Sequence, residues 1–209
     1  MPDLISKGLL PKELPPCFAS RELALSLSSI NLASEKNSVC ESTTFTLPQA
    51  NGTRRTLTIP NPKGHLWLAK SMNDHWEDID AILSNGAVSA SRPIVDAGGM
   101  VIRQPADLPT KRIMTRRRGR FLLRLDLNDF YRSVYTHALP WAVHGRATAK
   151  ANRSATTHWG NSLDRHAGLA TSNETHGIPV GPITSLVLAE LLLSPVDKFI
   201  SETLRPAGA

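Results

Sequence analysis

The sequence predicts an α+β protein, because strand patterns and helix patterns occupy separate stretches of the chain. Two β-rich runs within residues 43–62 flank an Asn-Gly pair, which is typical of a tight hairpin turn. Apolar residues recur at helical spacing over residues 63–84 and again within residues 176–204. A further strand is predicted at residues 121–127, where leucines alternate with an arginine and an aspartate.

Composition and charge limit the classes of protein. A chain of 209 residues, 41% of them hydrophobic, can bury a core. The formal net charge of +6 favours an acidic partner, most commonly nucleic acid. Cys17 and Cys40 form no CxxC spacing, so neither a disulfide framework nor a zinc cluster is predicted. No apolar run is long enough for a membrane span and no leader pattern opens the chain, so we expect a cytoplasmic protein without membrane contact.

The first sixty residues predict an arm, a short helix and a hairpin. Residues 1–20 contain four prolines, which exclude a long helix and favour an extended arm. Ser20 is placed to cap a short helix over residues 20–30. The hairpin is expected at residues 43–60, with two arginines just past its turn.

The middle of the chain predicts one helix, a loop and a basic run. Residues 63–84 read as a single helix ended by an Asn-Gly pair, and residues 86–110 are rich in Gly, Pro, Ser and Ala, as loops are. Residues 111–120 contain six Lys or Arg, either a solvated face or a nucleic-acid contact. The helix within residues 176–204 contains Pro195, which should bend or divide it.

Several kinds of catalytic site are not indicated. Five histidines lie between residues 137 and 176, but their spacing fits no HExxH or HxxxH metal pair. The chain contains no GxSxG elbow and no Walker-type phosphate loop.

A nucleotidyl-transfer site fits better, because that chemistry needs carboxylates at a strand end to hold divalent metal ions. On a strand, the leucines at 123, 125 and 127 share one face, and Asp126 points from the other face into a cleft. Phe130 and Tyr131 follow, placed to lie beneath a sugar or to anchor the next helix.

Two ordered stretches resemble the reverse transcriptases, particularly the bacterial group that includes abortive-infection and other phage-defence enzymes. "LRLDLNDFYRSVYTHALPWAVHG" is similar to the motif A region, and "HGIPVGPITSLVLAELLL" is similar to motif B in the form that group uses. "LLPKELPPCFAS" and "RRTLTIPNP" are similar to the start of that group. The resemblance implies fingers and the first half of a polymerase palm. Residues 1–110 would form arm and fingers, and residues 111–209 a partial palm, with motif A at 121–137 and motif B at 176–204.

The resemblance also implies roles for individual residues. Asp126 would be the first metal-binding aspartate, with the Leu127 carbonyl completing the metal shell around magnesium or manganese. Arg55, helped by Arg54, would grip the triphosphate of a deoxynucleotide, and Tyr131 would exclude a 2′-hydroxyl.

Further roles concern the template side of the site. Gly181 would let template or nucleotide approach the backbone, with Thr184 and Ser185 supporting the template-side loop. Val180 stands where many reverse transcriptases have glutamine, a substitution usual in the bacterial group. Arg116, Arg117 and Arg118 of the basic run are the predicted nucleic-acid contacts. The implied partners are an RNA template, a DNA primer or product, and dNTPs; the oligomeric state stays open.

The family's motif C, Tyr or Phe followed by any residue and Asp-Asp, does not occur in the 209 residues. A two-metal site with one aspartate lacks most of its transition-state stabilisation, so we expect a truncated segment that does not polymerise alone. Two alternatives stay open: a non-catalytic nucleic-acid-binding remnant of such a protein, and a degenerate fragment that does not fold stably.

Overall fold

Helices dominate the structure, and the described strands form two antiparallel hairpins, so the prediction of mixed α and β structure is confirmed. The computed structural model describes residues 2–31, 39–85, 89, 92–96, 99–102, 108–117, 121 and 123–203. The helices of the first half are α1 (Pro2–Ser6), α2 (Arg21–Leu25), the 3₁₀ helix η1 (Ser26–Ser29), α3 (Pro62–Asp74), α4 (Trp76–Ser84) and α5 (Leu108–Arg117). Those of the second half are α6 (Phe130–Ser133), α7 (Ala138–His144), α8 (Arg146–Ala151), α9 (Trp159–Leu169) and α10 (Ile183–Thr203). The strands are β1 (Thr43–Pro48), β2 (Arg54–Ile59), β3 (Pro93–Asp96) and β4 (Gly99–Ile102).

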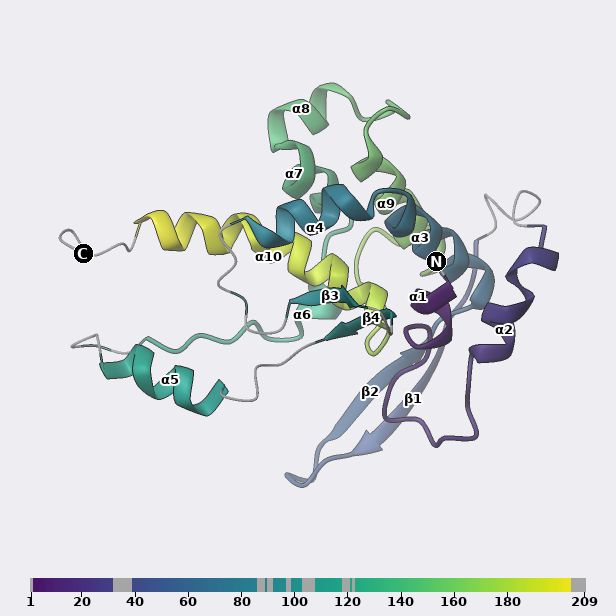
Figure 1. Ribbon diagram of the computed structural model, residues 1–209, viewed down its shortest axis with the longest axis horizontal. Coiled ribbons are helices and arrows are strands. Elements are labelled where there is room, and N and C mark those ends of the chain that lie inside the picture. The colour runs from purple at the N-terminus through teal and green to yellow at the C-terminus, as the bar shows by residue number, and fades with distance from the viewer. Residues whose placement is uncertain are drawn as a thin grey trace.

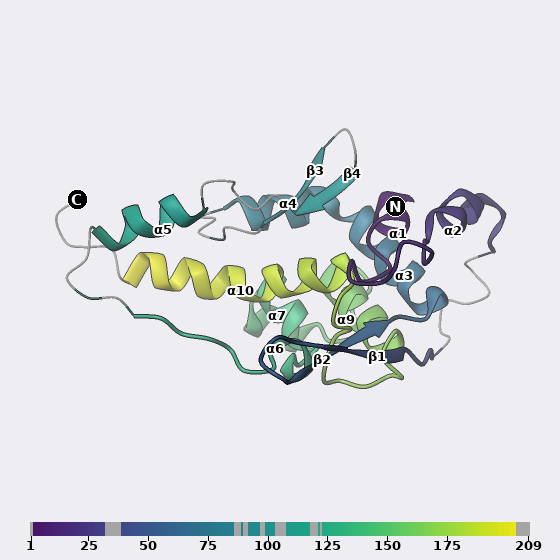
Figure 2. The ribbon, with the colours of Figure 1, turned by 90° about the horizontal axis from the view of Figure 1, so that it is seen from below.

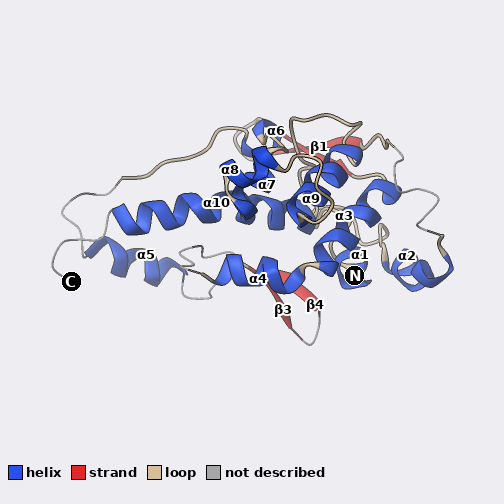
Figure 3. Cartoon of the chain, turned by 90° about the horizontal axis from the view of Figure 1, so that it is seen from above, coloured by secondary structure: helices blue, strands red, loops and turns tan. Residues whose placement is uncertain are grey.

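The long helix α10 runs through the middle of the molecule (Figure 1). Figures 2 and 3 show α4 and α5 on one side of it, and α6, α7, α9 and the β1–β2 hairpin on the other. Helix α10 packs against α4 and α7, and α3 packs against α9. Among the described residues, no helix combines the length and the apolar character needed to cross a bilayer.

One apolar core joins the two halves of the chain. It includes Leu4 and Ile5 of α1, Met72 of α3, and Leu188 and Leu191 of α10. The predicted N-terminal arm therefore contributes a helical turn to the core. The proposed boundary at residue 110 is crossed by this core, and the division into fingers and palm stays a prediction.

The hairpin predicted at residues 43–60 is confirmed. Strands β1 and β2 pair antiparallel, with Thr43 opposite Ile59 and Pro48 opposite Arg54. Gly52 has φ +81°, a conformation that side chains disfavour and that the turn requires. The turn therefore places Arg54 and Arg55 at the start of β2.

The single helix predicted over residues 63–84 is wrong in one respect, because the structure has two helices that meet at His75. Helix α3 starts where Asn61 Oδ1 accepts the Lys63 backbone N–H, with Pro62 following it. At His75 the backbone leaves the helical region (φ −123°, ψ 26°), and its ring stacks on Trp159, with centroids 5.4 Å apart. A tertiary contact thus accompanies the break.

The loop predicted at residues 86–110 is also wrong in part. Strands β3 and β4 form a hairpin there, and α5 begins at Leu108. Gly and Pro content suggested a loop, whereas the short apolar runs on either side of the turn pair with each other. The remaining residues of the predicted loop include several outside the described residues.

The strand predicted at residues 121–127 is not formed by the described residues of this segment. They run without regular secondary structure toward α6 (Figure 2). Leu123, Leu125 and Leu127 are exposed, so the face expected to be buried is uncovered. A strand needs a neighbour to pair with, and the described residues supply none here.

Ser20 does not have its predicted role. It makes no side-chain cap for α2; its hydroxyl donates to the Ile5 carbonyl oxygen (2.6 Å) and ties α2 to α1. Of the two alternatives predicted for Pro195, division of the last helix is excluded, because α10 continues to Thr203, and a bend stays a prediction.

Candidate functional site

Several predicted site residues meet at an open cavity of about 640 Å³. Strand β2, the turn before α6, α6 itself and the residue before Gly181 build its walls. It is lined by Gln49, Arg54, Arg55, Thr56, Asn128, Asp129, Phe130, Tyr131, Arg132 and Val180. We call it the hairpin cavity. Three arginines, one aspartate and two aromatic rings are among the lining residues, so the charged side chains of the cavity sum to a net positive charge.

A pair of hydrogen bonds fixes the hairpin to the start of the α10 segment. The Thr58 backbone N–H donates to the Val180 carbonyl oxygen (2.8 Å). In return, the Val180 N–H donates to Thr58 Oγ1 (3.3 Å). The Ile178 N–H donates to the Tyr131 carbonyl oxygen (2.8 Å), which attaches α6 to the same segment. The three walls of the hairpin cavity are thus joined through residues 178–180.

Arg54 and Arg55 differ in how they are held. Arg54 Nε donates to Thr46 Oγ1 (2.8 Å) and its Nη2 to the Thr46 carbonyl oxygen (3.1 Å), so β1 orients it. Arg55 Nη1 lies 3.3 Å from Glu13 Oε1 of the N-terminal arm. This exposed ion pair is weak, on the order of 0–1 kcal/mol, and an anionic ligand can replace the carboxylate.

Tyr131 is half-buried and its ring meets Phe130 edge-on, with centroids 5.8 Å apart. Burial and the nearby Glu190 carboxylate raise the pKa of Tyr131, and the Arg55 guanidinium opposes them. Burial also raises the pKa of Glu190, while a hydrogen bond from Ser89 (3.1 Å) lowers it. The charges of Arg55 on the hairpin and of Glu190 on α10 therefore act in opposite directions on the pKa of Tyr131.

Asp126 and Leu127, the predicted metal ligands, are exposed and do not line the hairpin cavity. Within the described part of the chain, no three His, Cys, Asp or Glu side chains gather as a metal site would require. Magnesium is held by several oxygen ligands, so these residues do not form a magnesium site by themselves.

Gly181 has a conformational requirement of its own, and its predicted role beside template or nucleotide stays a prediction. Its φ is +127°, and a Cβ there would lie 2.6 Å from Pro11 Cγ of the N-terminal arm. The space beside Gly181 is therefore filled by this chain's own proline. Thr184 and Ser185 are buried at the start of α10, and their predicted support of a template-side loop stays a prediction.

The basic run lies mainly on α5. Arg116 and Arg117 are exposed in its last turn, where cations also interact favourably with the helix dipole. Arg118 lies outside the described residues. Of the two described arginines, neither Arg116 nor Arg117 lines the hairpin cavity.

Sequence reasoning missed five lining residues, namely Gln49, Thr56, Asn128, Asp129 and Arg132. Asp129 has φ +47° and its side chain does not cap α6; its Oδ1 lies 3.8 Å from Arg132 Nε. The positive φ of Asp129 turns the chain sharply before α6. Asn and Asp are common turn residues, so the Asn128–Asp129 pair is the feature of the sequence from which this turn could have been predicted.

A second polar cluster was also missed. His137 Nδ1 and Asp164 Oδ2 are 2.5 Å apart and lie between two cavities that share no residue with the hairpin cavity. The two residues are 27 positions apart in the sequence, so no local motif announces them.

Comparison with known proteins adds no family to these observations. No model of a known protein family matches the chain, and no curated protein matches it.

Proposed function

We propose that this chain is the nucleotide-binding segment of a reverse-transcriptase-like, RNA-directed DNA polymerase of palm and fingers architecture. The observation that carries the proposal is the hairpin cavity, where Arg55, Tyr131 and Val180 come together from three separate parts of the chain. These are the positions that the resemblance assigns to triphosphate, sugar and the motif B turn.

In the proposed function, a dNTP places its triphosphate against Arg55, with Arg54 and Arg132 beside it. Arginine suits this role, because its guanidinium donates two hydrogen bonds to phosphate oxygens. The sugar lies over Tyr131, whose ring leaves no room for a 2′-hydroxyl. In the full reaction, a primer 3′-hydroxyl attacks the α-phosphate and pyrophosphate leaves. Asp126 is the side chain proposed for the first metal position, and further carboxylates are needed for polymerisation.

Binding of a labelled dNTP to the whole chain tests the nucleotide site. We expect Arg55→Ala to weaken binding about 10-fold, the loss of one charge-assisted hydrogen bond. Arg21→Ala, an exposed arginine of α2, is the matched control and should bind as the parent does. Equal dNTP affinity of the parent and Arg55→Ala, with both folded, would reject the hairpin cavity as the site.

The ion pair with Glu13 gives a test of opposite sign. Glu13→Gln removes the carboxylate that competes for Arg55, so dNTP affinity should rise about 2- to 5-fold. Primer extension with magnesium or manganese is expected to give no product from this chain alone. Sustained extension that disappears in Asp126→Ala would overturn that expectation.

The second candidate is a non-catalytic RNA-binding protein, and the exposed arginines of α5 favour it. Binding to RNA should then weaken steeply with salt, by about one power of salt concentration per phosphate contact, and show no metal dependence. Loss of RNA binding in Arg116→Ala together with unchanged dNTP affinity would favour this candidate over the first.

A further inference from the structure

Two adjoining cavities lie on the part of the molecule formed by α7, α8, α9 and the loops between them. Their volumes are about 390 and 230 Å³, and they share His137, Arg153, Asn161 and Asp164. None of the residues predicted from the sequence as functional lines either one. They form a site separate from the hairpin cavity.

The walls of this site are held by contacts between distant segments. Asn161 Nδ2 donates to the carbonyl oxygens of Asn152 and Ala155, both at 2.9 Å, and so holds the loop after α8 against α9. The Thr136 N–H donates to the Thr175 carbonyl oxygen (2.9 Å), which fixes the chain before α7. The cavities are therefore built on an ordered frame.

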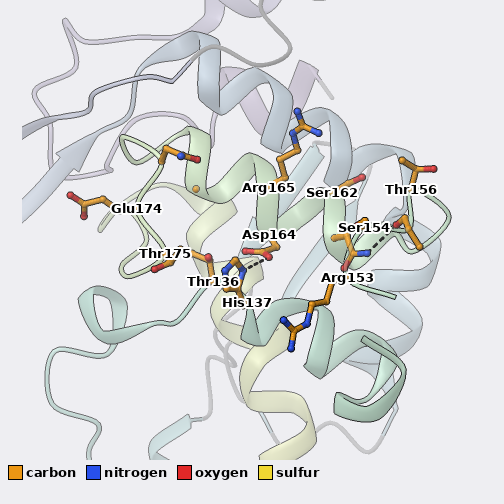
Figure 4. Close-up of a pocket in the computed structure, with 14 residues that line it drawn as sticks. Thr136, His137, Arg153, Ser154, Thr156, Ser162, Asp164, Arg165, Glu174 and Thr175 are labelled. Carbon is orange, nitrogen blue, oxygen red and sulfur yellow. Dashed lines mark hydrogen bonds and ion pairs between the residues drawn. The ribbon is translucent and has the colours of Figure 1, made fainter. Parts of the chain in front are cut away.

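His137 and Asp164 form the centre of the site (Figure 4). The Asp164 side chain is 17% exposed and the His137 side chain 46%, so the carboxylate is the buried partner. The contact occupies Nδ1 of the imidazole, which leaves Nε2 to meet a ligand. In Figure 4, Arg153 lies on one side of this pair and Glu174 on the opposite side.

The smaller cavity favours an anion. Lys150 and Arg153 line it, and its one carboxylate, Asp164, is engaged by His137. Glu174 belongs to the larger cavity alone. A phosphate is thus better accommodated beside Lys150 and Arg153 than in the larger cavity.

Aromatic rings line the same cavity. Tyr135 is 37% exposed, and its ring meets those of His137, Trp141 and His176 at centroid distances of 5.0, 5.8 and 5.2 Å. These contacts hold the ring in one orientation. The Arg146 guanidinium lies over the ring of Trp141, 5.3 Å from its centroid.

We propose that this cavity binds a segment of single-stranded nucleic acid, with a base against Tyr135 and its phosphate beside Lys150 and Arg153. Ordered aromatic rings interleaved with cations are the surface on which single strands stack while their backbones are neutralised. The proposal does not depend on the hairpin cavity, since the two sites share no residue.

The test is titration of the full chain with a labelled short oligouridylate, followed by anisotropy. Tyr135→Ala should weaken binding about 5- to 100-fold, the range for losing one stacked base, whereas Tyr135→Phe keeps the ring and should bind like the parent. Lys150→Ala and Arg153→Ala should each weaken it about 2- to 10-fold and reduce the salt slope by about one. Arg21→Ala is the control.

Two further arms make the outcome decisive. An oligomer with abasic sugars should bind weakly to the parent and show no difference between Tyr135→Ala and Tyr135→Phe. The proposal is overturned if folded Tyr135→Ala and Arg153→Ala bind oligouridylate as the parent does, or if uridine monophosphate binds as tightly as the oligomer. Arg55→Ala should leave oligouridylate binding by this cavity intact, so failure here and failure at the hairpin cavity are distinguishable.

Discussion

The two halves of α10 show how differently this molecule covers its apolar residues. In the first half, Val187, Leu188 and Leu191 are buried against α4 and α7. In the second half, Val196, Phe199 and Ile200 are exposed. Helix α10 thus has apolar side chains along both halves. Within the described part of the chain, other helices cover these side chains only in the first half.

The segment at residues 121–127 belongs with the uncovered half. Phe121 is 93% exposed and Leu125 79% exposed, and Ile113 and Met114 of the neighbouring α5 are exposed as well. We call these residues, together with the second half of α10, the open region. Large exposed apolar patches often mark a surface that meets another surface. Among the described residues, the apolar side chains of α10 are covered by other helices in its first half and exposed in its second half.

The largest expected difference concerns two leucines of equal size. Leu188→Ala removes a fully buried side chain and should lower the free energy of unfolding by about 2–5 kcal/mol. Leu125→Ala in the open region should change it by less than about 0.5 kcal/mol. Urea unfolding of both variants measures the difference. Comparable losses in the two would show that residues 121–127 are packed in solution.

A second large loss of stability is expected at Gly181, just before the buried first half of α10. Gly181→Ala should cost about 2–4 kcal/mol, because alanine is strained at φ +127° and its methyl would meet Pro11. Gly145→Ala is the matched control, since its φ is +79° but nothing lies within 4 Å of an added Cβ. The excess loss in Gly181→Ala measures the Pro11 contact, and equal losses would argue against it.

The stability of the folded chain should also depend on pH, through a buried histidine of α3. His65 is buried, and burial lowers its pKa from 6.5 to about 3. Below pH 6.5 the unfolded chain gains a proton that the folded chain does not accept, so stability is full above pH 6.5 and falls toward pH 3. At pH 5 the loss should be about 2 kcal/mol.

Urea unfolding between pH 7.5 and 5 measures this loss. His65→Gln should flatten the dependence, whereas His176→Gln, which changes an exposed histidine, should retain it. An unchanged slope in His65→Gln would assign the pH dependence to another group.

Substitutions in the open region are expected to have the smallest effect on the free energy of unfolding. They should nevertheless change how strongly the chain associates with itself. Replacing Leu123 and Leu125 together by Ser should leave the unfolding free energy within about 0.5 kcal/mol and reduce self-association, measured by light scattering. Leu25→Ser, an exposed leucine of α2, is the control and should not change association. If Leu25→Ser reduced it equally, the open region would have no special role.

Short-range sequence patterns predicted the helices and strands whose formation depends on residues close together in the sequence. The Asn-Gly turn predicted β1 and β2, and the apolar spacing predicted α10. The break at His75 could not be predicted in this way, because it coincides with stacking on a ring 84 positions away, Trp159. The strand at 121–127 failed for the same physical reason, since its alternation is real but pairing requires a partner strand.

The candidate site was predicted in part. Sequence resemblance chose Arg54, Arg55 and Tyr131, and all three line one cavity. It also chose Asp126, which lies in the open region, and Thr184 and Ser185, which are buried. The His137 and Asp164 pair had no local signal, because its distance of 2.5 Å follows from how α7 and α9 pack.

The hydrogen bonds between Thr58 and Val180 have a consequence for the order of folding. They join positions 122 residues apart, and the entropy of closing so long a loop must be overcome before the contact can form. The β1–β2 hairpin and the helices need only contiguous residues and form on a faster timescale. We therefore expect the hairpin cavity to assemble late, after the elements that line it.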